Sequence, residues 1–244
     1  MEIEFKKMKV KSLKEHFVNE MESQIISGRL SPGDRLPSER ELSKQVGISR
    51  SVVNMGILEL ATKGFVKVIP RKGTFIADYM KESSIAILSA VLHHLDEDMD
   101  KKLFIDTNHT RSALEVESAR EAAINRSGED VEALEIFIKT MEQSKDIETL
   151  ISTNIDFHNR VTSASKNMVS YILLKSFEDV IRQVLKYFYN IPGAMECSFK
   201  SHKVLFEEIK QKDRMKSGEA MKKIFVESEK IFLDYNKNNT DFKK

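Results

Sequence analysis

The sequence predicts a mainly α-helical protein of two domains. The first is a winged helix-turn-helix of three helices and a β-hairpin wing, and the second is an antiparallel all-α bundle of about six to seven helices. Most glycines and prolines precede residue 80, which indicates a turn-rich first part. The rest has long stretches of helical apolar spacing with few breakers.

The composition is typical of a soluble globular protein. The chain has 244 residues, of which 41% are hydrophobic and 32% charged, enough for two modest domains. The longest apolar stretch, Ile85–Leu92, is too short to span a bilayer, and the first residues do not resemble a signal peptide. Cys197 is the only cysteine, so no intrachain disulfide can form. We therefore expect a cytoplasmic protein with no membrane partner.

Charge is distributed unevenly along the chain, although the formal net charge is +1. Residues 1–78 carry 14 lysines and arginines against 10 acidic residues, which leaves a net negative charge on the remainder. Seven basic and only two acidic residues lie between Arg40 and Lys72. A basic stretch in a nearly neutral protein indicates a surface that faces nucleic acid.

The first two helices have recognisable limits. Residues 12–27 place apolar side chains at helical spacing. Ser38 and Glu41 form a capping box that begins a second helix, and Gly47 suits the left-handed position after its end.

A third helix and a hairpin follow. Ser49 caps a helix that ends at Gly64, and Arg50 and Asn54 share its outer face. Two short β-type runs, residues 65–69 and 74–77, are joined by a basic turn. Three helices and a hairpin predict the winged helix-turn-helix over residues 1–78.

The second domain follows a linker at residues 79–84. It is predicted to occupy residues 85–235, and the polar residues 236–244 are predicted to be a disordered tail. The predicted helices are residues 85–92, 103–124, 131–141, 146–163, 168–190, 197–212 and 215–235.

Four motifs of the first domain resemble the GntR family of bacterial regulators. They are LPSERELS at residues 36–43, VGISR at 46–50, GFV at 64–66 and GTFI at 73–76, in the family's order and spacing. The second domain resembles the ligand-sensing FCD domain of the FadR subfamily, through RSALE at 111–115, Ala122-Ala123, Phe157-His158 and His202. The resemblance covers roughly residues 10–235. It implies a ligand-responsive transcriptional repressor that binds an inverted-repeat operator in double-stranded DNA as a homodimer.

The resemblance also implies which residues contact DNA. Arg50 lies in the first turn of the recognition helix, where a guanidinium suits guanine. Asn54 stands where the family more often has arginine; it either contacts adenine or a phosphate, or is a neutral surface residue. In the basic hairpin turn, Lys72 would bring a positive charge to a DNA phosphate, and Gly73 would let the backbone approach the phosphate closely. The predicted DNA-binding residues are Arg40, Ser49, Arg50, Asn54, Lys72 and Gly73.

The resemblance further implies an effector pocket in the second domain. Arg111 is similar to a pocket arginine of the subfamily and suits a carboxylate, although it also has Glu115 as a possible partner one helical turn away. The predicted effector is therefore a small organic acid. The predicted effector-binding residues are Arg111, Asn154, His158 and His202.

A divalent metal, Zn²⁺ or Ni²⁺, is a second expectation for this pocket. Many members of the subfamily use an aspartate and three histidines, to which Asn154, His158 and His202 correspond here. Asn154 replaces the aspartate, and the last histidine is replaced by Ile224 or Glu227, depending on the alignment. The alternative is a metal-free pocket in which both histidines form hydrogen bonds with the effector.

Two other classes of function compete with a ligand-responsive regulator. One is a metal-dependent enzyme that uses the two histidines. No nucleophile–base constellation, phosphate loop or HExxH motif accompanies them, so we expect no enzyme. The other is an architectural DNA-binding protein whose second domain binds no effector.

Overall fold

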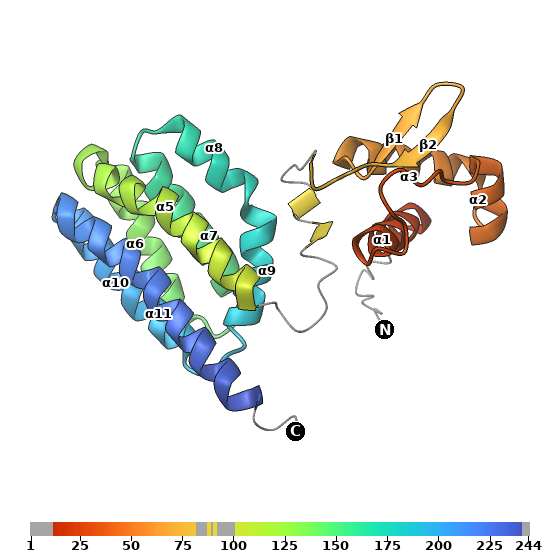
Figure 1. The fold of residues 1–244 in the computed structure, drawn as a ribbon. Coiled ribbons are helices and arrows are strands. Elements are labelled where there is room, and N and C mark those ends of the chain that lie inside the picture. Colours follow the sequence, from red (N-terminus) through yellow and green to blue (C-terminus); the bar gives the residue numbers. More distant parts are fainter. Residues whose placement is uncertain (1–11, 82–86, 89, 92–100, 241–244) are drawn as a thin grey trace, which may run out of the picture. The chain divides into compact units, whose positions relative to one another are not determined.

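A computed structural model of the chain describes residues 12–81, 87–88, 90–91 and 101–240. The chain divides into two compact units, residues 1–94 and 95–244 (Figure 1), and each is described by itself. Within the described residues, no helix is long and apolar enough to cross a membrane.

Three capped helices form the first unit: α1 (Leu13–Ile26), α2 (Glu39–Val46) and α3 (Arg50–Lys63). Ser38 accepts a hydrogen bond from the backbone N–H of Glu41, whose carboxylate accepts from the backbone of Ser38. The chain turns into the left-handed region after α2 and α3, at Gly47 and Gly64. The predicted starts and ends of the second and third helices are thus confirmed.

The wing is an antiparallel hairpin of β1 (Val66–Ile69) and β2 (Gly73–Ile76). Gly73 has a φ of 117°, which favours glycine, and lies at the end of the turn. Beneath the hairpin, α1 and α3 pack closely, since a Cβ atom on Gly56 would lie 2.4 Å from the ring of Phe17. The winged helix-turn-helix is confirmed.

The first unit extends beyond the expected linker. Ile87 and Ala90 are buried in the same apolar core as Phe17 and Leu60. By these contacts Ile87 and Ala90 belong to the first unit, whereas the sequence assigns them to the second domain. The rest of the helix expected at residues 85–92 lies outside the described residues.

The second unit is all-α in its described part (Figure 1). Helix α5 packs against α7, α10 and α11, and α10 also contacts α6 and α11. A large apolar core lies between these helices. The helices are α5 (Lys101–Asn125), α6 (Gly128–Gln143), α7 (Ile147–Ala164), α8 (Met168–Ser176), α9 (Glu178–Phe188), α10 (Ala194–Lys210) and α11 (Arg214–Thr240).

Two boundaries differ from the expected ones. The single helix expected over residues 168–190 is two helices, α8 and α9, which meet at Phe177. Neither glycine nor proline marks this break, and Phe177 packs against the core. Helix α11 continues to Thr240, so the expected tail is helical at its start, where Asn236 donates a hydrogen bond to the carbonyl of Phe232.

Candidate functional site

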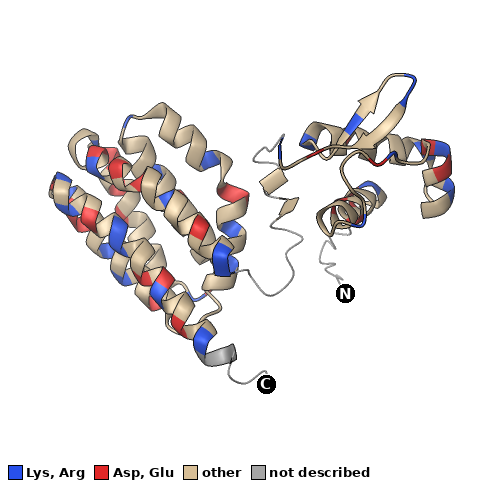
Figure 2. Cartoon of the chain, in the orientation of Figure 1, with Lys and Arg blue, Asp and Glu red and all other residues tan. Residues whose placement is uncertain are grey.

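The first unit presents most of the predicted DNA-binding residues at its surface. Arg40, Ser49, Arg50, Asn54 and Lys72 are exposed. Among the described residues, the side chains of Arg40, Arg50 and Lys72 form no hydrogen bond or ion pair, so their charges are available to a ligand. Figure 2 shows basic residues on α2 and at the turn of the β1–β2 hairpin.

Two of these residues have partners within the first unit. The amide nitrogen of Asn54 donates a 2.7 Å hydrogen bond to Glu39 at the start of α2. This contact leaves the amide oxygen of Asn54 as an acceptor. The hydroxyl of Ser49 lies 2.9 Å from that of Ser51 and caps α3 through the backbone N–H of Val52.

A small cavity lined by both polar and apolar side chains lies inside the second unit. It is lined by side chains from α5, α7, α9, α10 and α11, and its open volume is about 30 Å³. All four predicted effector-binding residues line it: Arg111, Asn154, His158 and His202. The bundle therefore brings residues from three separate helices to one place.

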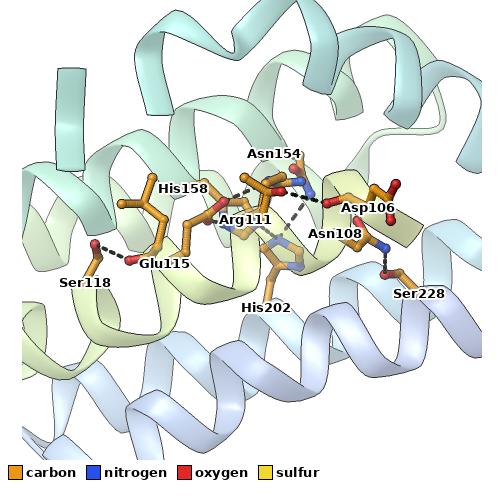
Figure 3. A network of polar contacts seen from close by, with 11 residues as sticks. Asp106, Asn108, Arg111, Glu115, Ser118, Asn154, His158, His202 and Ser228 are labelled. Atoms are coloured by element: carbon orange, nitrogen blue, oxygen red, sulfur yellow. Dashed lines mark hydrogen bonds and ion pairs between the residues drawn. The ribbon is translucent and has the colours of Figure 1, made fainter. Parts of the chain in front are cut away.

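Arg111 and His158, which line the cavity, belong to a charged network centred on Glu115 (Figure 3). Arg111 Nε donates a 2.7 Å hydrogen bond to Glu115 Oε1, and the other carboxylate oxygen of Glu115 contacts His158 Nδ1. The guanidinium carbon of Arg111 lies 5.1 Å from the centre of the Phe225 ring. Arg111 thus contacts Glu115, as the simpler interpretation of the sequence predicts, and also lines the cavity.

The partners of the two histidines determine their tautomers. His202 Nδ1 lies 2.7 Å from the carbonyl oxygen of Ser198, so Nδ1 carries the proton and Nε2 is an acceptor. His158 Nδ1 faces the carboxylate of Glu115 and carries a proton by the same argument. The two Nε2 atoms lie 3.0 Å apart.

Asn154 completes the network with its amide nitrogen. Its Nδ2 donates to His202 Nε2 at 3.1 Å and to the hydroxyl of Tyr189 at 3.0 Å. Because His202 Nε2 is an acceptor, the nitrogen of the amide must face it, and not the oxygen. Among the described residues, Asn154 Oδ1 and Arg111 Nη2 are buried and have no hydrogen-bond partner.

Burial and charge set the protonation of the network. Burial alone would raise the pKa of Glu115, but the charge of Arg111 and the contact with His158 outweigh it and lower that pKa to about 2. Burial lowers the pKa of His158. Burial and the neighbouring His158 together lower the pKa of His202 to about 3. The carboxylate of Glu115 is therefore ionised at neutral pH, and burial disfavours a positive charge on either imidazole.

The donor set does not match a divalent metal. The described residues contain no group of three histidine, cysteine, aspartate or glutamate side chains placed to hold one. Ile224 lines the cavity, whereas Glu227 accepts a hydrogen bond from Ser201 and lines a separate hollow. Asn154 points its nitrogen at His202. Two imidazoles and one amide oxygen are fewer and weaker donors than zinc sites have.

Sequence reasoning missed three contributors to these sites. Glu39 was not singled out, although it binds Asn54; Glu115 was considered only as a partner of Arg111. The sequence does not indicate a polar role for Tyr189, because an aromatic residue at helical spacing is usually part of a core. Its hydroxyl accepts from Asn154 and lies 2.9 Å from the hydroxyl of Ser198.

An exposed arginine on the recognition helix and a basic wing turn, in one chain with a helical unit whose cavity is lined by an arginine and two histidines, fit a DNA-binding regulator with a sensing domain. Comparison with known families agrees. Residues 13–76 match the family of bacterial regulatory proteins called gntR, and residues 106–227 match the FCD domain. The chain belongs to the GntR family of transcriptional regulators and carries the FCD ligand-sensing domain.

Individual relatives are distant. The galactonate operon transcriptional repressor of Escherichia coli K12 is 25% identical, over 78% of this chain and 83% of that protein. A fatty acid metabolism regulator protein of Proteus mirabilis is 27% identical, over 78% and 77%. The solved structure of Lar, which controls the agr system of Listeria monocytogenes, has a TM-score of 0.63 at 19% identity, over 92% of this chain and 98% of that one. The last likeness concerns the fold alone.

Proposed function

We propose that the protein is a repressor that binds an inverted-repeat operator as a homodimer and that a small organic acid in the helical cavity changes its affinity for DNA. The observation that carries the effector proposal is the buried Arg111 Nη2, a charged donor that lines the cavity and has no partner among the described residues. A carboxylate is the group that such a donor binds most strongly.

Two further observations support a sensing cavity. Two of the buried polar atoms without a partner, Arg111 Nη2 and Asn154 Oδ1, belong to residues that line this one cavity, where a bound ligand could pair with them. The two relatives described above are named for galactonate and for fatty acids, which are carboxylic acids. An effector acts as a switch if it binds one arrangement of the DNA-binding units better than another.

Arg111→Ala is expected to weaken effector binding strongly. Loss of a charge-assisted contact in a buried site weakens a carboxylate by about 10- to 100-fold. A thermal-shift screen of small carboxylates supplies the ligand, and calorimetry compares its affinity for wild type, Arg111→Ala and a control, Arg182→Ala, whose arginine is exposed on α9. If Arg111→Ala binds the effector as tightly as wild type and still binds DNA, then Arg111 is only the ion-pair partner of Glu115 and not an effector-binding residue.

We infer that this pocket works without a metal. Zn²⁺ or Ni²⁺ is then expected to leave the melting temperature unchanged, and a chelator to have no effect, because a site-bound ion would stabilise the folded state. The measurement is a thermal melt together with metal analysis of the purified protein. One equivalent of metal that is lost in His158→Ala, but kept in the exposed-histidine control His109→Ala, would contradict the inference.

The homodimer is expected because one small winged helix makes few base contacts and two-fold symmetry doubles them. Light scattering at micromolar concentration is expected to give twice the mass of the chain, and footprinting is expected to show two protected half-sites. A monomer bound to a single half-site would refute this part of the proposal.

A further inference from the structure

The side chain of Asn54, on the recognition helix, is held by a residue of the neighbouring helix. Its amide nitrogen donates a 2.7 Å hydrogen bond to Oε1 of Glu39, the first residue of α2. Asn54 is exposed and Glu39 is half-buried, so the pair lies at the surface of the first unit. The amide oxygen of Asn54 accepts no hydrogen bond from the residues that the structure describes. It is therefore free to meet a ligand.

The carboxylate of Glu39 decides which way this amide faces. An exposed asparagine can present either its oxygen or its nitrogen, because the two ends of the amide exchange places when it rotates. A carboxylate has no proton to donate, so the reversed amide would place oxygen against oxygen. Leu42 of α2 and Val53 of α3 are buried in the same core, and packing thus holds the two helices together. Asn54 is left with its oxygen facing outward as an acceptor.

The edges of the bases in the major groove decide which of them suits such an acceptor. Adenine and cytosine present an amino group there, at N6 and N4, whereas guanine and thymine present a carbonyl oxygen, at O6 and O4. An amino group donates to the oxygen of Asn54, but a carbonyl oxygen faces it acceptor against acceptor. Adenine also offers N7 to the second amide proton of Asn54, so adenine fits best and cytosine next.

A phosphate suits the pair less well than a base. Phosphate oxygens are acceptors, so they gain nothing from the amide oxygen of Asn54. They also carry negative charge, and the carboxylate of Glu39 beside Asn54 repels them. Of the two contacts that an asparagine here can make with DNA, the geometry favours the base.

We propose that Asn54 selects an adenine or cytosine in each half-site, and that Glu39 is the positioning residue that gives it this preference. The inference rests on the proposed binding of an operator by α3, and it adds the class of base and the second residue. Arg50 and Asn54 are four residues apart, about 6 Å along the helix. The selected base is therefore expected within about two base pairs of the one that Arg50 contacts.

The test measures base preference along the half-site with the full chain. Selection from a random library supplies the operator, and binding assays then place each of the four base pairs at each position, changed in both half-sites together. One position near that of Arg50 is expected to prefer adenine or cytosine over guanine and thymine by about fivefold or more per half-site. In Asn54→Ala, this preference is expected to fall to about one.

Glu39→Ala tests the positioning role. It leaves the amide of Asn54 in place but free to rotate, so the preference at the same position is expected to fall towards one, while the preference at the Arg50 position stays. Glu20→Ala is the matched control, because it removes the same charge and a hydrogen bond to an amide, that of Gln24 on α1. It is expected to keep both preferences.

A double variant separates positioning from a structural role. The carboxylate that Asn54→Asp introduces is an acceptor at both ends and needs no orientation. Asn54→Asp combined with Glu39→Ala has the same net charge as the wild-type pair. This double variant is expected to prefer cytosine or adenine, although Glu39→Ala alone does not. Each preference is a ratio within one protein, so a general loss of stability does not imitate it.

Every other outcome counts against a particular part of the inference. A preference for guanine or thymine that is lost in Asn54→Ala would overturn the acceptor role. If Asn54→Ala changes no base preference, Asn54 does not read a base. An unchanged preference in Glu39→Ala, or no preference in the double variant, would overturn the positioning role. In these cases the operator is still bound and the proposed function stands, whereas failure to enrich any sequence would overturn both.

Discussion

Replacing Arg50 with alanine is expected to abolish the distinction between operator and random DNA. Arg50 is exposed in the first turn of α3, where an arginine reaches the edge of a guanine. A lost bidentate contact costs about 1–3 kcal/mol, and a homodimer loses it twice, so operator affinity is expected to fall roughly 30- to 20,000-fold. Binding curves on operator and random duplexes measure the effect, once selection from a random library has supplied the operator.

Lys72→Ala is the informative comparison. Lys72 lies in the turn of the wing, and a phosphate contact there carries no sequence information. This variant is expected to weaken binding to both duplexes. The slope of log affinity against log salt concentration is expected to become shallower by about one per half-site, because one phosphate contact is lost there. If Arg50→Ala and Lys72→Ala lose affinity equally on both duplexes, the two roles are wrongly assigned.

Glu115→Ala is expected to destabilise the helical unit strongly. The carboxylate is fully buried and is the shared partner of Arg111 and His158. Removing one member of a buried ion pair costs about 3–5 kcal/mol, because the remaining charge is left unpaired. For a chain of this size the melting temperature is expected to fall by roughly 6–20 °C.

Glu117→Ala is the matched control on the same helix. Glu117 is 54% exposed and pairs with Arg120 and Arg214 at the surface, so its loss is expected to cost about 1 kcal/mol or less. Equal destabilisation by both variants would show that the Glu115 network contributes no more than a surface ion pair.

The pH dependence of stability provides an independent check. Folding lowers the pKa of Glu115 to about 2, below the value of about 4.3 in an unfolded chain. The stabilisation is therefore complete above about pH 4.3 and is lost as the pH falls towards 2. In denaturant titrations, the difference in stability between wild type and Glu115→Gln is expected to stay constant above this range and to narrow below it. A difference that widens in acid would contradict the assigned pKa.

Local signals determined most of the DNA-binding half. Caps such as Ser38 with Glu41, and the glycine that ends α2, act through hydrogen bonds within a few residues, so their spacing can be read directly from the sequence. The break between α8 and α9 could not be predicted, because Phe177 carries no turn signal and its place is decided by packing against the core.

The sequence by itself determined the two-unit plan, the family, and the residues Arg111, Asn154, His158 and His202 as members of one site. Only the tertiary structure decided what each atom of that site can do. His158 meets Glu115 across 43 positions of the chain, and Asn154 meets His202 across 48. The physical reason is that the neighbours of a buried imidazole or amide decide which of its atoms donates and which accepts a hydrogen bond, and here those neighbours come from other helices.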